Sequence, residues 1–120
     1  MRVLLVDDEK ELVSTLAERL SFRGIDAEWT TSGAQALKLL ETEVFDIAVL
    51  DMKLPKMSGL ELKKEIQAKM PAMKFIFMTG HGSGDDFRAG TAETGVDYYL
   101  IKPVKIEALI ERMKEVLRKN

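Results

Sequence analysis

Short hydrophobic runs alternate with longer amphipathic segments along the whole 120-residue chain. The short runs are rich in valine, isoleucine, leucine and phenylalanine, which is typical of buried strands. In the longer segments hydrophobic residues recur every three or four positions, which is typical of helices. The pattern predicts five strands, at residues 3–6, 25–30, 45–50, 74–78 and 97–101.

Five helices are predicted, one after each strand. Asp7 or Asp8 is expected to cap the first, residues 31–33 to open the second, and Pro71 to close the third. Residues 54–59 are expected to form a loop, because proline and glycine break regular structure. The fourth helix, near residues 85–93, lies in a segment with five glycines and is expected to be the least stable.

This alternation predicts a parallel sheet with right-handed crossovers and helices on both faces. A chain of 120 residues suits one compact domain, so residues 1–120 are interpreted as a single domain. In such folds the functional groups gather at the carboxyl ends of the strands.

Composition excludes several classes of function. The net charge of −2 gives no basic field for nucleic acid or anionic lipid, so neither direct nucleic-acid binding nor membrane binding is expected. The absence of cysteine excludes disulfides, zinc–thiolate sites and cysteine nucleophiles. No hydrophobic run is long enough to span a membrane, and the N-terminus is unlike a signal peptide. A cytoplasmic protein is therefore predicted.

Polar residues follow four of the five predicted strands: Asp7 and Asp8, Asp51, Thr79 and Lys102. Taken singly, each has an ordinary interpretation as a helix cap, a turn residue or a strand exit. Three carboxylates, a hydroxyl and an ammonium at one edge of a sheet are informative because they coincide.

Crowded carboxylates must take up protons or bind a cation, and oxygen ligands favour Mg²⁺, with Mn²⁺ as an alternative. A carboxylate beside the metal stays ionised, so Asp51 could attack phosphorus and form an aspartyl phosphate. The metal and Lys102 would offset the negative charge of the transferred group, and Thr79 would donate a hydrogen bond to it.

Four stretches, in this order and spacing, resemble the receiver domain of bacterial two-component response regulators over residues 2–118. They are Val6–Glu9, Leu50–Gly59, Met78–Gly80 and Tyr99–Pro103. The resemblance implies a doubly wound, flavodoxin-like α/β fold, with a five-stranded parallel sheet of order 2-1-3-4-5 and five helices. It also implies a phosphorylation-dependent signalling switch rather than an enzyme that turns over an external substrate.

By the same resemblance, Asp51 accepts a phosphoryl group from a sensor histidine kinase or a phosphotransfer protein. Asp7, Asp8, Asp51 and the main-chain carbonyl of Lys53 would hold Mg²⁺. Lys102 would contact the phosphoryl group, through a cis peptide to Pro103.

The resemblance further implies that Thr79 moves toward the phosphate and that Tyr99 turns inward, although Tyr99 could also be a half-buried strand aromatic. Helix four, strand five and helix five would then signal to an output domain or a downstream protein, with phosphorylation-induced homodimerisation left open. Lys53 and His81 lie two residues beyond Asp51 and Thr79, where side chains can modulate rates, although His81 is also interpretable as an exposed loop residue. The wording around His81 resembles receivers attached to transcription activators, so an output in transcription regulation is one option.

Three rival functions fit the sequence less well. A haloacid-dehalogenase-like phosphatase needs a second aspartate where Lys53 stands. A flavodoxin-like cofactor binder needs a glycine-, serine- or threonine-rich phosphate loop after strand one, where this chain has Asp-Asp-Glu-Lys. A degenerate receiver that only binds partners would lack one of the five groups, and none is lost here.

Overall fold

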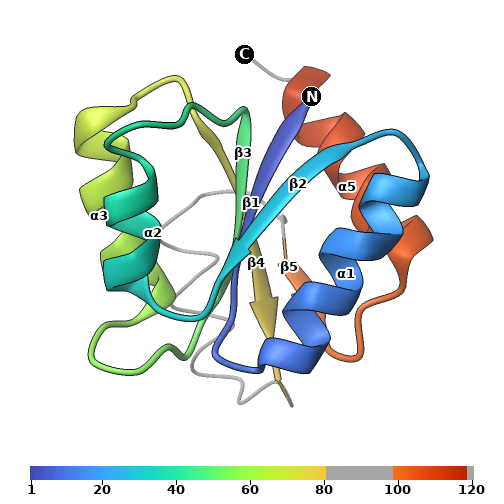
Figure 1. Cartoon of the computed structure of the whole chain (residues 1–120), viewed down its shortest axis with the longest axis horizontal. Coiled ribbons are helices and arrows are strands. Elements are labelled where there is room, and N and C mark those ends of the chain that lie inside the picture. Colours follow the sequence, from blue (N-terminus) through green and yellow to red (C-terminus); the bar gives the residue numbers. More distant parts are fainter. Residues whose placement is uncertain (81–98, 119–120) are drawn as a thin grey trace.

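The computed structural model describes residues 1–80 and 99–118, and within these the five strands form one parallel sheet in the order β2-β1-β3-β4-β5 (Figure 1). The strands are β1 (Arg2–Val6), β2 (Asp26–Thr30), β3 (Ile47–Asp51), β4 (Lys74–Thr79) and β5 (Tyr99–Ile101). The predicted fold class and strand order are confirmed.

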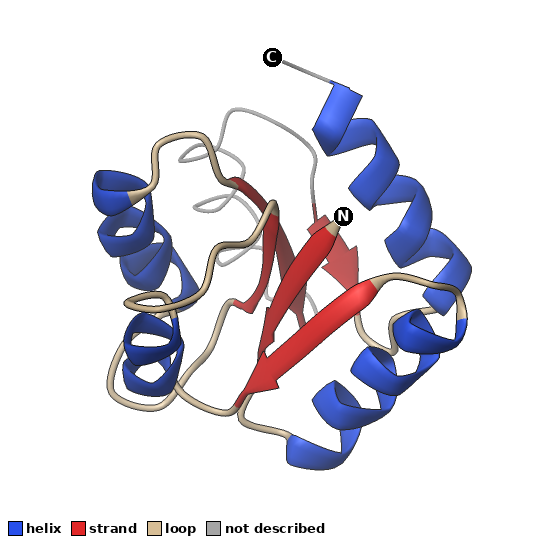
Figure 2. Cartoon of the chain, turned by 45° about the horizontal axis from the view of Figure 1, so that its top comes forward, coloured by secondary structure: helices blue, strands red, loops and turns tan. Residues whose placement is uncertain are grey.

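Within the described residues, four helices cover the two faces of the sheet (Figure 2). Helices α1 (Lys10–Phe22) and α5 (Ile106–Arg118) lie on one face, and α2 (Gly33–Leu39) and α3 (Gly59–Lys69) lie on the other. These four confirm four of the five predicted helices. The helix predicted near residues 85–93 lies outside the described residues.

Two apolar cores lie on either side of the sheet, and alternate residues of each strand enter different cores. In β1, Val3 and Leu5 pack under α1 and α5, whereas Leu4 and Val6 pack under α2 and α3. All five residues of β3 are buried. A strand that is buried on both faces is mostly apolar, which explains why Val3–Val6 and Ile47–Leu50 appear in the sequence as continuous hydrophobic runs. Asp51, the last residue of β3, is the buried exception.

The prediction that Asp7 or Asp8 caps the first helix was wrong. The N-cap residue of α1 is Glu9, and it makes no side-chain capping bond. Asp7 Oδ1 instead accepts a hydrogen bond from the Glu9 amide at 2.8 Å, just before the first residue of α1. This leaves the other Asp7 oxygen directed elsewhere.

The other helix ends are closer to expectation. Ser32 caps α2 by accepting a hydrogen bond from the Gln35 amide, and Pro71 follows the last residues of α3. The prediction placed Gly59 in the loop of residues 54–59. In the structure Gly59 is instead the first residue of α3. Ser58 and Glu61 form a reciprocal capping box there, which satisfies two amides that the helix itself cannot pair.

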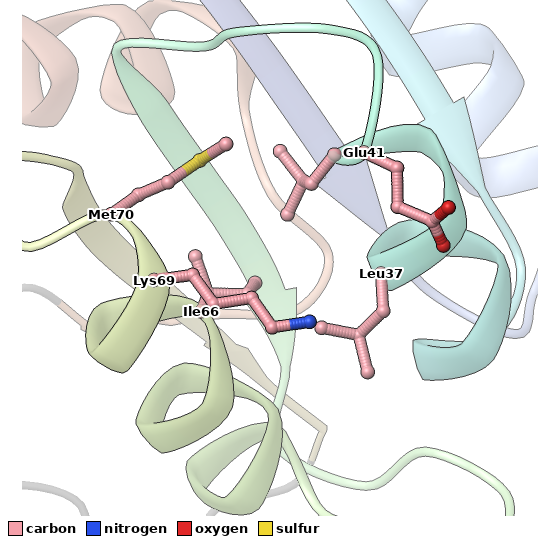
Figure 3. A pocket seen from close by; sticks show the side chains of 6 residues that line it. Leu37, Glu41, Ile66, Lys69 and Met70 are labelled. Carbon is pink, nitrogen blue, oxygen red and sulfur yellow. The ribbon is translucent and has the colours of Figure 1, made fainter.

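A small crevice lies between α2 and α3 (Figure 3), and none of the polar strand-end residues lines it. Its volume is about 70 Å³, and its lining is mostly apolar: Leu37, Leu40, Glu41, Ile66, Lys69 and Met70. Functional pockets usually combine apolar walls with several converging polar groups, and this crevice lacks them. None of the described helices has the length and hydrophobicity needed to cross a membrane.

Candidate functional site

The carboxyl ends of β1 and β3 bring three carboxylates together. Val6 and Leu50 are paired in the parallel ladder, so Asp7, which follows β1, lies beside Asp51, the last residue of β3. Asp7, Asp8 and Asp51 each offer one oxygen, and these oxygens lie within 4.8 Å of one another. The structure thus groups the three residues that the sequence suggested as metal ligands.

Burial makes this group electrostatically demanding. Asp7 is 0% exposed and Asp51 is 5% exposed, whereas Asp8 is exposed. Burial raises the pKa of Asp51, and the negative charge of Asp7 raises it further, despite the opposing effects of Lys102 and the Lys53 amide. A nearby cation stabilises the ionised form of carboxylates that are buried and close together.

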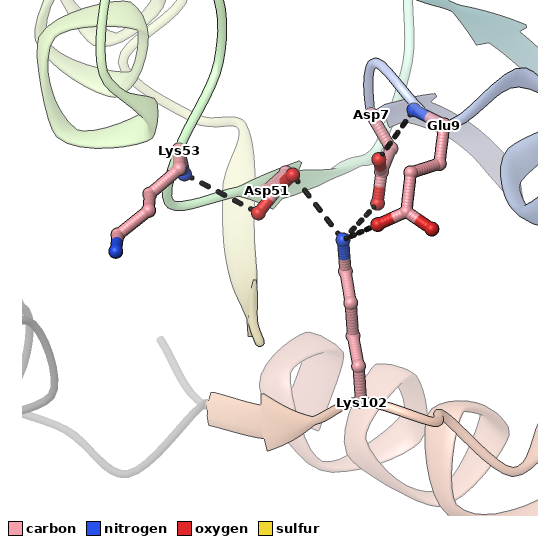
Figure 4. A network of polar contacts seen from close by, with 5 residues as sticks. All are labelled: Asp7, Glu9, Asp51, Lys53 and Lys102. Atoms are coloured by element: carbon pink, nitrogen blue, oxygen red, sulfur yellow. Dashed lines mark hydrogen bonds and ion pairs between the residues drawn. The ribbon is translucent and has the colours of Figure 1, made fainter. Parts of the chain in front are cut away.

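Lys102 supplies such a cation from the opposite side (Figure 4). Its Nζ lies 2.7 Å from Asp7 Oδ2, 3.2 Å from Asp51 Oδ2 and 3.1 Å from Glu9 Oε1. Burial alone would lower the pKa of Lys102, but the contact with Asp7 and the charges of Asp51 and Asp7 outweigh it, so that pKa is raised. The ammonium is therefore charged throughout the physiological range.

The chain around Lys102 is fixed by β4. The Lys102 amide donates to the Thr79 carbonyl at 2.8 Å, and the Lys102–Pro103 peptide is cis, as the resemblance implied. Thr79 ends β4 and is buried, and the neighbouring Met78 pairs with Asp51 across the ladder. Thr79 therefore ends its strand at the same edge of the sheet as the carboxylates.

The loop after β3 holds Asp51 from the other side. The Lys53 amide donates to Asp51 Oδ1 at 3.2 Å, and Lys53 forms an isolated bridge with Ser58. The Lys53 side chain is exposed and points away from the carboxylates (Figure 4). Its main chain therefore lies beside the site, while its side chain lies on the solvent side.

Within this loop Lys56 has a φ of +67°, in the left-handed region that favours glycine. We expect Lys56→Gly to raise the free energy of unfolding by about 0.5–1 kcal/mol, because removing the Cβ strain outweighs the greater freedom of glycine in the unfolded chain. Urea unfolding measures this. Lys56→Ala is the matched control, because it removes the same side chain but keeps the strain. An equal gain in both variants would contradict the explanation.

Tyr99 begins β5 with its side chain turned into the protein. It is buried, and its ring stacks on Phe77 with centroids 5.4 Å apart and an interplanar angle of 18°. Tyr99 is therefore more enclosed than the half-buried strand aromatic that the sequence offered as an alternative, and its ring already lies inside the protein. His81 lies outside the described residues.

Glu9 belongs to one of the stretches that resemble receiver domains, but no role was predicted for it. The structure places its carboxylate on Lys102. Three acidic residues in a row directly after a strand, Asp7 to Glu9, were the available signal.

Comparison with known proteins gives the family. The family model of the response regulator receiver domain matches residues 3–114. The chain belongs to this family. Receiver domains have a general role as phosphorylation-dependent switches in two-component signalling and are not enzymes that turn over an external substrate.

Curated relatives agree. The chain is 36% identical over 118 residues to the transcriptional regulatory protein GlrR of Escherichia coli (strain K12), covering 98% of this chain and 26% of that protein. It is 33% identical over 120 residues to the response regulator MprA of Mycobacterium avium (strain 104), covering 100% of this chain and 52% of that protein. The chain thus spans between a quarter and a half of these relatives, which are larger proteins.

Solved structures of similar length share the fold. A CheY-like receiver domain protein from Methanospirillum hungatei JF-1 superimposes with a TM-score of 0.86 at 34% identity, covering 98% of this chain and 93% of that one. The non-phosphorylated HemR receiver domain from Leptospira biflexa superimposes with a TM-score of 0.81 at 31% identity, covering 99% of this chain and 95% of that one.

Proposed function

We propose that Asp51 accepts a phosphoryl group from the phosphohistidine of a sensor histidine kinase or of a phosphotransfer protein. One observation carries this proposal: a nearly buried carboxylate at a strand end faces both a lysine ammonium and two further carboxylates. One Asp51 oxygen would form a bond to phosphorus while the bond from phosphorus to the donor imidazole nitrogen breaks. That nitrogen then takes up a proton.

The donor set fits Mg²⁺, with Mn²⁺ as the alternative. Its ligands are all oxygens, and the exposed position of Asp8 leaves space for water, which Mg²⁺ usually retains. Asp7, Asp8, Asp51 and the main-chain carbonyl of Lys53 would hold the ion. When bound, Mg²⁺ would neutralise the carboxylates and the charge on the transferred phosphoryl group.

Four residues of the chain then have tasks in the transfer. Lys102 would contact a phosphoryl oxygen with its ammonium, and Thr79 would donate its hydroxyl hydrogen to another. The Lys53 amide, which already donates to Asp51 Oδ1, orients the attacking carboxylate. Lys53 and His81 would adjust the rates of phosphorylation and hydrolysis through their side chains.

Intact-mass measurement tests the proposal. With acetyl phosphate and Mg²⁺ the chain should gain one acid-labile phosphoryl group, and with EDTA in place of Mg²⁺ it should gain none. Incorporation that is unaffected by EDTA would remove the metal from the account, and no incorporation from either acetyl phosphate or a phosphorylated kinase would overturn the proposal.

Mg²⁺ is also expected to stabilise the unphosphorylated protein. An ion that binds only the folded state adds about 2.7 kcal/mol at one hundred times its Kd. Thermal melts with and without MgCl₂ measure the shift. Asp8→Asn should lose most of it, whereas Glu11→Gln, a change of equal charge in the first turn of α1, should keep it. Melts of the unmodified chain that do not respond to Mg²⁺ would contradict the assigned ligands.

The output would be a change of shape. We propose that Thr79 moves toward the phosphoryl group and that Tyr99 turns further inward, into the space that Thr79 leaves. This would alter the face formed by the helix predicted near residues 85–93, β5 and α5. Ile101, the last residue of β5, supports this because 59% of it is exposed. An output domain, a downstream protein or a second copy of the chain would bind there, and light scattering of the phosphorylated chain distinguishes the last of these by a doubled mass.

The proposal includes a single domain over residues 1–120 that acts in the cytoplasm and does not itself bind nucleic acid or membrane. The absence of cysteine and the net charge of −2 support it. Transcription regulation is the proposed pathway of output, because GlrR is a transcriptional regulatory protein. Limited proteolysis of the chain tests the single domain: stable cleavage into two folded halves would contradict it.

A further inference from the structure

Glu9 has a contact that its position in the fold does not explain. It is the N-cap residue of α1, but its side chain makes no capping bond. Its carboxylate reaches instead to Lys102, 93 residues away, with Oε1 lying 3.1 Å from Nζ (Figure 4). The Glu9 side chain is 60% exposed, so it holds this ion pair from the solvent side of the site.

The main chain of Glu9 touches the same network. Its amide donates to Asp7 Oδ1 at 2.8 Å, while Asp7 Oδ2 lies 2.7 Å from Lys102 Nζ. Glu9 therefore orients one partner of Lys102 and is itself another partner. The lysine side chain is only 11% exposed, and its ammonium contacts the carboxylates of Asp7, Glu9 and Asp51.

The position of Lys102 conflicts with metal binding. Its ammonium contacts Asp7 and Asp51, and both belong to the group of carboxylates that can hold a cation. An ammonium and a divalent ion a few ångströms apart repel strongly in a buried site. When a metal occupies Asp7, Asp8 and Asp51, Lys102 must lose much of its attraction to two of its three carboxylate partners.

Glu9 is the third partner, and it lies outside that group of ligands. We propose that Glu9 is a positioning residue that retains the Lys102 ammonium beside Asp51 once the metal has taken the other carboxylates. Lys102 then stays within reach of an incoming phosphoryl group instead of moving into solvent. This inference rests on the proposed function, because it concerns the metal-loaded site.

NMR of the lysine side-chain ammonium groups tests the inference on the unphosphorylated full chain. The Lys102 signal is assigned by its absence in Lys102→Met, and calorimetry confirms Mg²⁺ binding in each sample. In the wild type the signal should persist at saturating Mg²⁺, because a held ammonium exchanges its protons slowly. In Glu9→Gln it should persist without Mg²⁺, where Asp7 and Asp51 hold Lys102, and disappear with Mg²⁺.

The matched control is Glu11→Gln, which removes the same charge from the exposed first turn of α1. Its Lys102 signal should match that of the wild type under both conditions. A Glu9→Gln signal that survives saturating Mg²⁺ would overturn the inference. Loss of the signal without Mg²⁺ as well would also overturn it, because Glu9 would then have a purely structural role.

Kinetics give a second readout. At saturating Mg²⁺, Glu9→Gln should slow phosphorylation by acetyl phosphate about two- to fivefold, the range expected for one exposed ion pair. The change should have no further effect in a Lys102→Met background, because the two residues act through one contact. An equal effect in both backgrounds would contradict the inference that Glu9 acts through Lys102. A wild type that neither binds Mg²⁺ nor becomes phosphorylated would instead overturn the proposed function.

Discussion

Asp51→Asn is expected to abolish phosphorylation by acetyl phosphate, because an amide oxygen does not form a stable bond to phosphorus as a carboxylate does. The fold should survive. The side-chain carbonyl of the introduced asparagine can still accept the hydrogen bond that Lys53 donates to Asp51 Oδ1. A neutral side chain also removes both effects that raise the pKa of Asp51, the burial of its charge and its repulsion by Asp7.

Intact mass after incubation with acetyl phosphate and Mg²⁺ measures this effect. Asp46→Asn is the matched control, because Asp46 precedes the same strand at its opposite end and accepts a hydrogen bond from the Arg2 amide. It should take up a phosphoryl group as the wild type does. Equal incorporation in Asp51→Asn and the wild type would show that another residue is the acceptor.

Gly59→Ala is expected to lower the free energy of unfolding by about 2–3 kcal/mol, through overpacking against backbone. A Cβ at Gly59 would lie 2.3 Å from the Asp51 carbonyl oxygen and 3.1 Å from Met52 Cα. Neither atom can move without shifting the end of β3. The Gly59 amide also donates to the Met52 carbonyl at 3.0 Å, which holds α3 close to this point.

Gly80→Ala provides the control, because a Cβ there meets no atom of residues 1–80 and 99–118 within 4 Å. Urea unfolding should show a change of less than about 0.5 kcal/mol for Gly80→Ala, as for most surface substitutions. Phosphorylation should also be slower in Gly59→Ala than in the control, since the displaced backbone carries Asp51. Equal stability of the two variants would contradict the close approach of α3 to β3.

Much of this fold could be predicted because the burial of each strand leaves a pattern in its own short stretch of sequence. Val3 to Val6 and Ile47 to Leu50 are buried on both faces of the sheet, so both strands are continuous apolar runs in the sequence. Parallel strands share one carboxyl edge, and this alone places Asp51 beside Asp7. The family resemblance then added the strand order.

What could not be predicted depends on contacts between distant segments. No sequence pattern indicates that the Glu9 side chain makes no capping bond and pairs with Lys102 instead. The two residues lie close together only because β5 pairs with β4. From the sequence alone Gly59 reads as a helix breaker, and nothing in a linear sequence shows which backbone will lie close to a glycine. Its role at the start of α3 follows from the proximity of Asp51.

The identity of the modified residue tests the central claim most directly. Borohydride reduces an aspartyl phosphate to homoserine, and peptide mass spectrometry then locates that homoserine in the phosphorylated, metal-loaded chain. The account predicts homoserine at position 51 and at no other aspartate. Homoserine at Asp7 or Asp8 instead, or a phosphoryl group that resists borohydride and maps to His81, would contradict it.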